Sequence, residues 1–495
     1  MTIHSNLSPA GVSFISGKHH LLIDGKWVTP QADQYFDVFD PGTGKVVARA
    51  AEAGSADVDL AVAAARRALD GPWSRLSPAQ RAKLLNRLAD LIESQADLLA
   101  EIEVIDNGKP MALAKAGIGG VADMVRYFAG WTSKFNGETV KISLPGEWHA
   151  FTSHVPIGVV GQIIPWNFPL SMAIWKLAPA LAVGCTVVLK PAEQTPLSAI
   201  KLGELILEAG IPEGVVNILT GFGSVAGAAL AAHPGVDKVA FTGSTATGKK
   251  IVQAALGNLK KVTLELGGKS PVFVFPDADV DAAIKGAASA IFLNSGQVCS
   301  AGSRLYAHKD VFDEVVEGVA RIGDEMKIGH GLDADTQLGP LISQQQFARV
   351  NGFIEGGHNQ GARTAGNGRQ PNLEGYFVPP TVLVDTRPDM DVVREEIFGP
   401  VLVASSFDND SIAGLAATAN DTDYGLFAGI WTADIGKALR FARQIKAGSV
   451  SVNAHMVNEP ALPFGGFKQS GWGRERGKEV LELYTELQSV AVKLG

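Results

Sequence analysis

Two cysteines occur in the 495-residue chain, and their surroundings differ. Cys185 lies in the apolar stretch 182–189, which predicts a buried structural residue. Cys299 lies in the polar, glycine-bounded stretch 294–304, and an accessible thiol in such a loop can form the nucleophilic thiolate. A buried structural loop is the alternative interpretation. Two separated cysteines and scattered histidines give no metal-ligand spacing, so we expect no metal.

A nucleophilic cysteine needs a base and a donor for the oxyanion, and two residues elsewhere in the chain are candidates. Glu265 lies near the end of the run 262–266, where strand alternation places its side chain opposite Val262, at the edge where open α/β sheets bind ligands. Asn167 lies between two prolines that stiffen its loop, and its amide could donate to an oxyanion. A solvent-facing carboxylate and a turn-forming asparagine are the alternatives.

Three glycine-rich segments raise the question of phosphate binding. Residues 117–120 fall in a helical pattern, which favours helix packing. Segments 221–227 and 243–248 each follow a predicted strand and open a helix, where free N–H groups can hold a pyrophosphate or form a plain tight turn. The first of these two is one residue too long for the dinucleotide fingerprint, so the ordinary Rossmann motif is absent. Lys190 and Glu193 follow another buried strand and could hold ribose hydroxyls or cap the loop.

Composition excludes several other functions. With 43 basic and 51 acidic residues the net charge is −8, and no basic cluster is available to neutralise nucleic-acid phosphates. The scarcity of cysteine excludes a disulfide framework and favours a reducing compartment. Residues 1–20 lack the apolar core of a signal peptide, and Lys176 and Pro179 interrupt the longest apolar stretch, 172–189. We therefore expect a cytoplasmic protein with no nucleic-acid or membrane partner.

The elements that must position these residues fall into two α/β series. An N-terminal arm of 17 residues is expected first, then strands at 21–28 and 35–39 and helices at 55–69 and 78–107. Alternation of apolar strands with helices then predicts parallel sheets that are covered on both faces. The first series has predicted strands at 157–164, 186–189, 215–219, 239–241 and 262–266, with helices at 170–183, 196–209, 224–232 and 246–256. The second has predicted strands at 272–275, 304–307, 381–384, 401–407 and 448–452, with helices at 279–292, 310–326, 343–360 and 434–446.

Two short stretches outside these series alternate apolar and polar residues. They are 141–144 and 485–492, and alternation of this kind predicts edge strands. Edge strands need partners, and pairing across subunits is one way to provide them.

Taken in order, seven segments of the chain resemble the aldehyde dehydrogenase superfamily over nearly its whole length. They are PWNFP (165–169), KPAEQTP (190–196), FTGST (241–245), LELGGKSP (264–271), GQVCSAGS (296–303), EEIFGPV (395–401) and PFGGFK (463–468). The resemblance implies an α/β fold with a Rossmann-like cofactor domain, residues 18–132 and 152–266, and a second α/β catalytic domain, residues 267–468. It further implies a small β oligomerisation element, residues 133–151 and 483–495, and therefore a homo-oligomer, either a dimer or a tetramer.

The resemblance also implies the chemistry. Cys299 would attack the aldehyde carbon to give a thiohemiacetal, and Asn167 with the Cys299 backbone N–H would hold the oxyanion. Hydride transfer to NAD would leave a thioester, and Glu265 would activate the water that releases the acid, or help to deprotonate the thiol. The presence of Glu265 favours a free acid over a coenzyme-A ester. Lys176 and Glu475 match positions at which the family is proposed to relay protons.

Cofactor residues carry over in the same way. The resemblance places Lys190 and Glu193 at the adenosine ribose, Ser244 at the pyrophosphate and Glu396 with Phe398 at the nicotinamide ribose. NAD is favoured because the Glu193 carboxylate repels a 2′-phosphate, while Lys190 leaves NADP as a weaker possibility. The implied cofactor residues are Ile163, Ile164, Pro165, Trp166, Asn167, Lys190, Glu193, Gly223, Gly227, Phe241, Gly243, Ser244, Glu265, Leu266, Gly267, Glu396 and Phe398.

The implied substrate residues are largely apolar or aromatic. They are Phe168, Met172, Trp175, Phe292, Leu293, Val298, Ser300, Met456, Val457 and Phe464. Because residues 453–468 are most similar to phenylacetaldehyde dehydrogenases, we predict phenylacetaldehyde or another aromatic or hydrophobic aldehyde, with aliphatic aldehydes as the alternative. A non-redox cysteine acyl hydrolase would want a histidine near Cys299, and only His308 is near it in sequence. An inactive binding protein is disfavoured because Cys299, Glu265 and Asn167 are all present.

Overall fold

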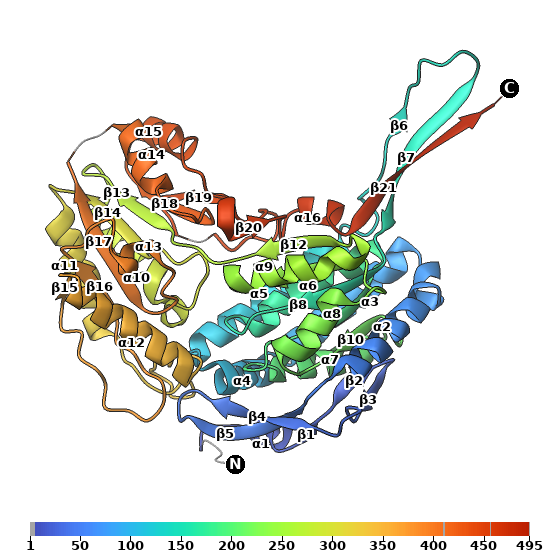
Figure 1. Ribbon diagram of the computed structural model, residues 1–495, viewed down its shortest axis with the longest axis horizontal. Helices are drawn as coiled ribbons and strands as arrows, with labels where there is room; N and C mark the ends of the chain where they lie inside the picture. Colours follow the sequence, from blue (N-terminus) through green and yellow to red (C-terminus); the bar gives the residue numbers. More distant parts are fainter. Residues whose placement is uncertain (1–4, 409–410, 456, 495) are drawn as a thin grey trace.

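The computed structural model describes residues 5–408, 411–455 and 457–494. Within these residues the strands form four sheets, of eight, seven, three and three strands (Figure 1). The two larger sheets are mainly parallel and lie in the two halves of the body, which confirms the predicted α/β fold. No helix in the described part of the chain combines the length and the apolar character needed to cross a membrane.

The eight-stranded sheet is parallel at its centre and antiparallel at its edges. In spatial order its strands are β20 (Gly471–Trp472), β12 (Lys261–Glu265), β11 (Lys238–Thr242), β8 (Val159–Ile163), β9 (Thr186–Lys190), β10 (Val216–Ile218), β2 (Leu21–Ile23) and β3 (Lys26–Val28). Successive residues of a strand point to opposite faces, so Val159 and Val160 enter different hydrophobic cores. The strand predicted at 21–28 is a hairpin instead, because Asp24 and Gly25 both adopt positive φ angles and turn the chain.

Helices cover both faces of this sheet, as the alternating pattern predicts. One core contains α3 (Pro78–Ser94), α4 (Ala96–Asn107), α5 (Met111–Ala129), α6 (Pro169–Val183) and α7 (Leu197–Glu208). The other contains α2 (Ser55–Leu69), α8 (Ala228–Ala232) and α9 (Thr245–Ala254). Shorter turns are η1 (Pro72–Arg75), η2 (Gly223–Gly227) and η3 (Ala255–Asn258). The single helix predicted over 78–107 is two helices, because Gln95 leaves helical geometry and the Ser94 hydroxyl donates to the Leu91 carbonyl at 2.8 Å.

The seven-stranded sheet forms the other half of the body. Its strands in spatial order are β15 (Arg363–Ala365), β16 (Thr381–Val384), β17 (Val401–Phe407), β14 (Arg304–His308), β13 (Pro271–Val274), β18 (Phe427–Trp431) and β19 (Ser449–Val452). Around it lie α10 (Val280–Phe292), η4 (Leu293–Gly296), α11 (Phe312–Glu325), α12 (Gln344–Asn359), α13 (Asp391–Arg394), α14 (Ile412–Asn420) and α15 (Ile435–Ala442). The predicted strands of this series did not include β18, a buried five-residue run with Gly429 at its centre, and glycine weakens the strand signal.

An N-terminal layer packs under the first half. It consists of α1 (Pro9–Ile15), β1 (Lys18–His19), β4 (Tyr35–Asp40) and β5 (Lys45–Ala51). The sequence predicts an N-terminal arm over the first 17 residues. Within the described part of it, residues 9–15 are helical, because Ser8 caps the helix and Ile15 is buried in the core.

A three-stranded sheet projects from the body and carries the C-terminal strand (Figure 1). It consists of β6 (Thr139–Val140), β7 (Trp148–Pro156) and β21 (Thr485–Lys493). In the chain, η5 (Lys468–Ser470) and α16 (Glu479–Glu482) lie between β7 and β21. The predicted strand at 485–492 is confirmed, since every residue of β21 pairs with β7. The predicted strand at 141–144 is wrong, because the β6 ladder contains only Thr139 and Val140 and alternation alone does not fix a register.

Candidate active site

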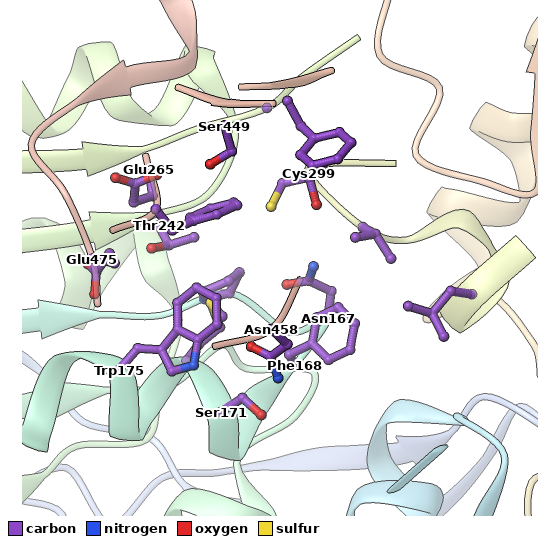
Figure 2. A pocket seen from close by; sticks show the side chains of 18 of the residues that line it. Asn167, Phe168, Ser171, Trp175, Thr242, Glu265, Cys299, Ser449, Asn458 and Glu475 are labelled. Carbon is purple, nitrogen blue, oxygen red and sulfur yellow. The ribbon is translucent and has the colours of Figure 1, made fainter. Parts of the chain in front are cut away.

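A cavity of about 1190 Å³ lies between the two large sheets. On one side it is lined by residues that follow the carboxyl ends of β8, β11 and β12, and on the other by the loop after η4 and by strand β19. In an open α/β sheet this edge is where ligands bind. Cys299, Glu265 and Asn167, which are 132 residues apart at most, all reach this cavity (Figure 2).

The Cys299 thiol is half-buried, and its loop is held by hydrogen bonds to the segment that carries Asn167. The Asn294 amide donates to the Asn167 carbonyl at 2.9 Å, and the Asn167 amide donates to the Gln297 carbonyl at 2.9 Å. Burial, together with the negative charges of Glu396 and Glu265, raises the pKa of the Cys299 thiol to about 12. The accessible thiolate expected from the loop sequence is therefore a neutral thiol here, and a base must remove its proton.

Glu265 ends β12 with its carboxylate buried inside the protein. Its side chain is 4% exposed, and neither carboxylate oxygen has a hydrogen-bond partner among the described residues. Burial, and then the charge of Glu475, raises the pKa of Glu265 well above its ordinary value. The alternative of a solvent-facing carboxylate is thus wrong, and the buried environment makes the Glu265 carboxylate more basic than an exposed one. A raised carboxyl pKa of this kind is typical of general acids and bases.

A buried ion pair stands beside Glu265. Lys176 of α6 donates to Glu475 at 2.5 Å and to the Thr242 hydroxyl at 2.7 Å, and both charged side chains are almost fully buried. Glu475 and Thr242 line the cavity (Figure 2), whereas Lys176 is not among its lining residues. The family resemblance indicates roles for Lys176 and Glu475 but gives none for Thr242, although Thr242 lies inside the FTGST segment.

The residues predicted at the adenosine ribose come together at the carboxyl end of β9. Lys190 donates to Glu193 at 2.9 Å, and burial lowers the pKa of Lys190. A Cβ atom added to Gly223 would lie 3.9 Å from both charged groups, and one added to Gly227 would lie 4.0 Å from the Lys190 stem. These two glycines therefore leave a free surface above the ion pair. Ser244 caps α9 and lines the large cavity, so the adjacent helix N-terminus faces it.

The residues predicted at the nicotinamide end also meet. Glu396 accepts a hydrogen bond from the Gly268 N–H at 3.0 Å, and its carboxylate lies so close to Gly267 that any Cβ there would collide with it. Burial raises the pKa of Glu396 to about 7. Phe398 meets the Trp166 ring edge-on at 5.2 Å. Of the remaining predicted cofactor residues, Pro165, Gly243 and Leu266 line the cavity, while Ile163, Ile164 and Phe241 are buried behind it.

Most of the predicted substrate residues line the same cavity. They are Phe168, Met172, Trp175, Leu293, Val298, Ser300, Val457 and Phe464. Phe292 does not, because its ring points back into the core of α10 and α11, against Gly323. Met456 lies outside the described residues. Phe168 and Trp175 flank the space in front of the Cys299 thiol (Figure 2).

Several lining residues were not predicted. Gly117 and Gly120 face the cavity, and an added Cβ on Gly117 would meet nothing within 4 Å, so helix packing does not explain this glycine. Helical periodicity does not show what this face of α5 meets, so the sequence carried no signal for Gly117. Asn458 and Arg476 also line the cavity. Asn458 follows the predicted substrate residue Val457, and Arg476 follows the predicted relay residue Glu475.

A class of protein is defined by three features together: the doubly wound sheet, the second α/β half, and the thiol in the cavity between them. The Aldehyde dehydrogenase family sequence profile matches residues 27–490, and the chain belongs to that family. This confirms the predicted family, fold and enzyme class. Mitochondrial aldehyde dehydrogenase of Homo sapiens is 45% identical over 96% of this chain and 92% of its own length.

Two further relatives are similar over almost the full length. Phenylacetaldehyde dehydrogenase of Pseudomonas fluorescens is 45% identical, and the match covers 99% of each chain. Among solved structures, the NAD+ complex of aldehyde dehydrogenase from Bacillus cereus has a TM-score of 0.97 and 46% identity, and the match covers 99% of each chain.

Proposed function

We propose that this NAD-dependent aldehyde dehydrogenase oxidises aromatic or other hydrophobic aldehydes, phenylacetaldehyde among them, to carboxylic acids. The observation that carries the proposal is the aromatic wall of Phe168, Trp175 and Phe464 in the cavity that holds the Cys299 thiol. Aromatic surface of this kind favours a flat apolar substrate. The 45% identity to a phenylacetaldehyde dehydrogenase supports the same substrate class.

Cys299 is the nucleophile of the proposed reaction. The thiol proton passes to water, the sulfur attacks the carbonyl carbon, and the carbonyl oxygen takes up negative charge. The second N–H of the Asn167 amide and the Cys299 backbone N–H donate to that oxygen, and such donors commonly contribute about 2.7–4 kcal/mol to the barrier. The bond from the Asn167 amide to Gln297 fixes the orientation that this role requires.

Glu265 acts as the base that completes the cycle. Bound NAD would supply the acceptor for the hydride of the former aldehyde carbon, and Cys299 would then carry the acyl group as a thioester. Glu265 takes a proton from water, whose oxygen attacks the thioester, so that the acid leaves and the thiol is restored. Lys176, Glu475 and Thr242 form a buried hydrogen-bonded chain beside Glu265, and we assign to it the onward transfer of the proton.

The residues present fit NAD. Lys190 and Glu193 would hold the adenosine ribose, the α9 N-terminus with Ser244 would hold the pyrophosphate, and Glu396 with Phe398 would hold the nicotinamide side. A side chain at Gly223 would cover the surface above the Lys190–Glu193 pair, and a side chain at Gly267 would collide with Glu396. NAD is preferred over NADP, because Glu193 repels a 2′-phosphate.

A comparison of substrates and cofactors tests the proposal. We expect kcat/KM for phenylacetaldehyde to exceed that for hexanal and for short aliphatic aldehydes by at least tenfold, with NAD preferred over NADP. A preference for aliphatic aldehydes would overturn the proposed substrate class. The competing acyl hydrolase gains no support from the site, because no histidine is among the described residues that line the cavity. Steady ester hydrolysis without NADH formation would favour it.

We propose a homo-oligomer, dimer or tetramer, that assembles through the projecting sheet. The outer edge of β21 is unpaired among the described residues, and Leu487 and Val492 are exposed on it. Light scattering of the full chain and of a chain ending at residue 482 tests the assembly, and an unchanged mass would contradict it.

We also propose three domains: a cofactor domain of residues 18–132 and 152–266, a catalytic domain of residues 267–468, and an oligomerisation element of residues 133–151 and 483–495. A cytoplasmic location is proposed because both cysteines are free thiols.

A further inference from the structure

Arg476 is a charged residue inside the substrate cavity. Its side chain is only 5% exposed, yet it lines the same cavity as Cys299. The guanidinium carbon lies 4.6 Å from the centroid of the Trp175 ring and 5.1 Å from that of Phe464, and one terminal nitrogen donates to the Asn458 side chain at 3.0 Å. All three neighbours also line the cavity, so the guanidinium forms part of its wall.

The positive charge of Arg476 lacks a partner within the described part of the chain. No described carboxylate lies within salt-bridge distance of it, and its Nε atom has no hydrogen-bond partner there. Three carboxylates, Glu265, Glu459 and Glu475, influence it only at longer range, and Glu475 is already paired with Lys176. Burial accordingly lowers the pKa of Arg476 to about 10, which still leaves it charged at neutral pH. A buried charge with no counter-ion is costly to keep, so a ligand that supplies the anion explains its presence.

The orientation of the guanidinium limits what this ligand can be. Trp175 and Phe464 occupy its ring-facing surfaces, so the N–H groups that do not donate to Asn458 remain for a hydrogen-bond acceptor. A purely hydrocarbon tail would bury against these edges without satisfying them. A carboxylate at the end of the substrate remote from the aldehyde would accept from them directly.

We infer that Arg476 is a specificity-determining residue that selects aldehydes carrying a carboxylate on the tail that points away from Cys299. This inference rests on the proposed oxidation of aromatic aldehydes, and it extends that substrate class to ring-bearing aldehydes with an anionic substituent. Arg476 binds the tail and takes no part in the bond-making steps.

The test compares two aldehydes of nearly the same shape, 4-carboxybenzaldehyde and 4-methylbenzaldehyde, with wild type, Arg476→Met and Arg476→Lys. The measured quantity is kcat/KM for 4-carboxybenzaldehyde divided by kcat/KM for 4-methylbenzaldehyde. We expect this ratio to be at least tenfold lower in Arg476→Met than in wild type, mainly through a higher KM for the carboxylate. Tenfold corresponds to about 1.4 kcal/mol, the lower end of what a charge-assisted hydrogen bond contributes. Arg476→Lys keeps the charge and should retain a larger share of the preference.

Two outcomes separate this inference from the proposed function. If the ratio is the same in wild type and Arg476→Met while both aldehydes are oxidised, Arg476 does not select the carboxylate and the inference is overturned. If neither aldehyde nor phenylacetaldehyde is oxidised by the wild-type protein, the proposed function itself fails. Binding of NAD, followed by protein fluorescence, identifies any variant that has lost its fold, and Arg476→Lys then carries the comparison.

Discussion

Glu265→Gln separates the two halves of the proposed reaction. The carboxylate is buried and neither oxygen has a described hydrogen-bond partner, so glutamine fits the same space and removes no bond from a neighbour. General bases contribute about 10²–10⁴ in rate. We expect steady-state kcat to fall by at least about 100-fold, or about 2.7 kcal/mol, while about one NADH per active site still appears in a first burst.

Stopped-flow absorbance of NADH measures the burst, and intact-protein mass spectrometry detects the acyl group retained on Cys299. Cys299→Ala is the matched control and should give neither burst nor adduct. Steady turnover near the wild-type rate in Glu265→Gln would refute the assignment of Glu265 as the base for thioester hydrolysis. Loss of the burst together with kcat would place Glu265 before the thioester, at removal of the thiol proton.

The same variant has a second signature in stability. Because the folded state raises the pKa of Glu265, the folded protein binds this proton more tightly than the unfolded chain does. The contribution of Glu265 to stability is therefore fully present below the unfolded pKa and declines as pH rises through the folded pKa. Urea denaturation should show a smaller loss of stability with rising pH in Glu265→Gln than in wild type. Identical slopes of stability against pH in the two proteins would contradict the raised pKa of Glu265. They would not affect its kinetic assignment as the base for thioester hydrolysis.

Three further substitutions test the surrounding machinery. Lys176→Met leaves the buried Glu475 carboxylate without its partner and should lower the free energy of unfolding by about 3–5 kcal/mol; an unchanged urea midpoint would count against the ion pair. Glu193→Gln removes the charge beside the ribose and should raise kcat/KM for NADP relative to NAD about tenfold, so an unaltered cofactor ratio would show that this carboxylate does not discriminate. Gly267→Ala places a Cβ against the Glu396 carboxylate and should raise KM for NAD at least tenfold, and initial rates with normal KM would argue against that placement.

The sequence predicted the two α/β series and the convergence of the catalytic residues because both follow from short-range rules. Apolar runs next to helical periods define strands buried on both faces, and the carboxyl ends of parallel strands meet at one edge. Phe292 illustrates the limit of that reasoning. Phe168 and Phe292 are both aromatic residues next to a predicted catalytic segment, but the last turn of α10 rotates only Phe292 into the core.

Features set by long-range packing could not be predicted in the same way. The role of Gly117 depends on what α5 faces, and helical periodicity does not contain that information. Alternation of apolar and polar residues at 141–144 does not reveal which residues pair with β7. The predicted strand therefore fell in the loop after β6. Arg476 was not predicted because an arginine in a glycine-rich stretch suggests a surface charge. Its burial depends on the rings of Trp175, which is remote in sequence, and Phe464, which is separated from it by a loop.

The hydrogen bonds between the Asn167 and Cys299 loops have a consequence for how the two halves of the body behave. The proposed nucleophile lies on the side of the seven-stranded sheet, and its oxyanion donor follows β8 of the eight-stranded sheet, so these bonds span the seam between them. Any hinge opening of that seam would disable catalysis while every helix and strand stayed intact. The rate at which an alkylating reagent modifies Cys299 therefore reports on docking of the halves, and Cys185, fully buried within one core, provides an internal reference for global unfolding.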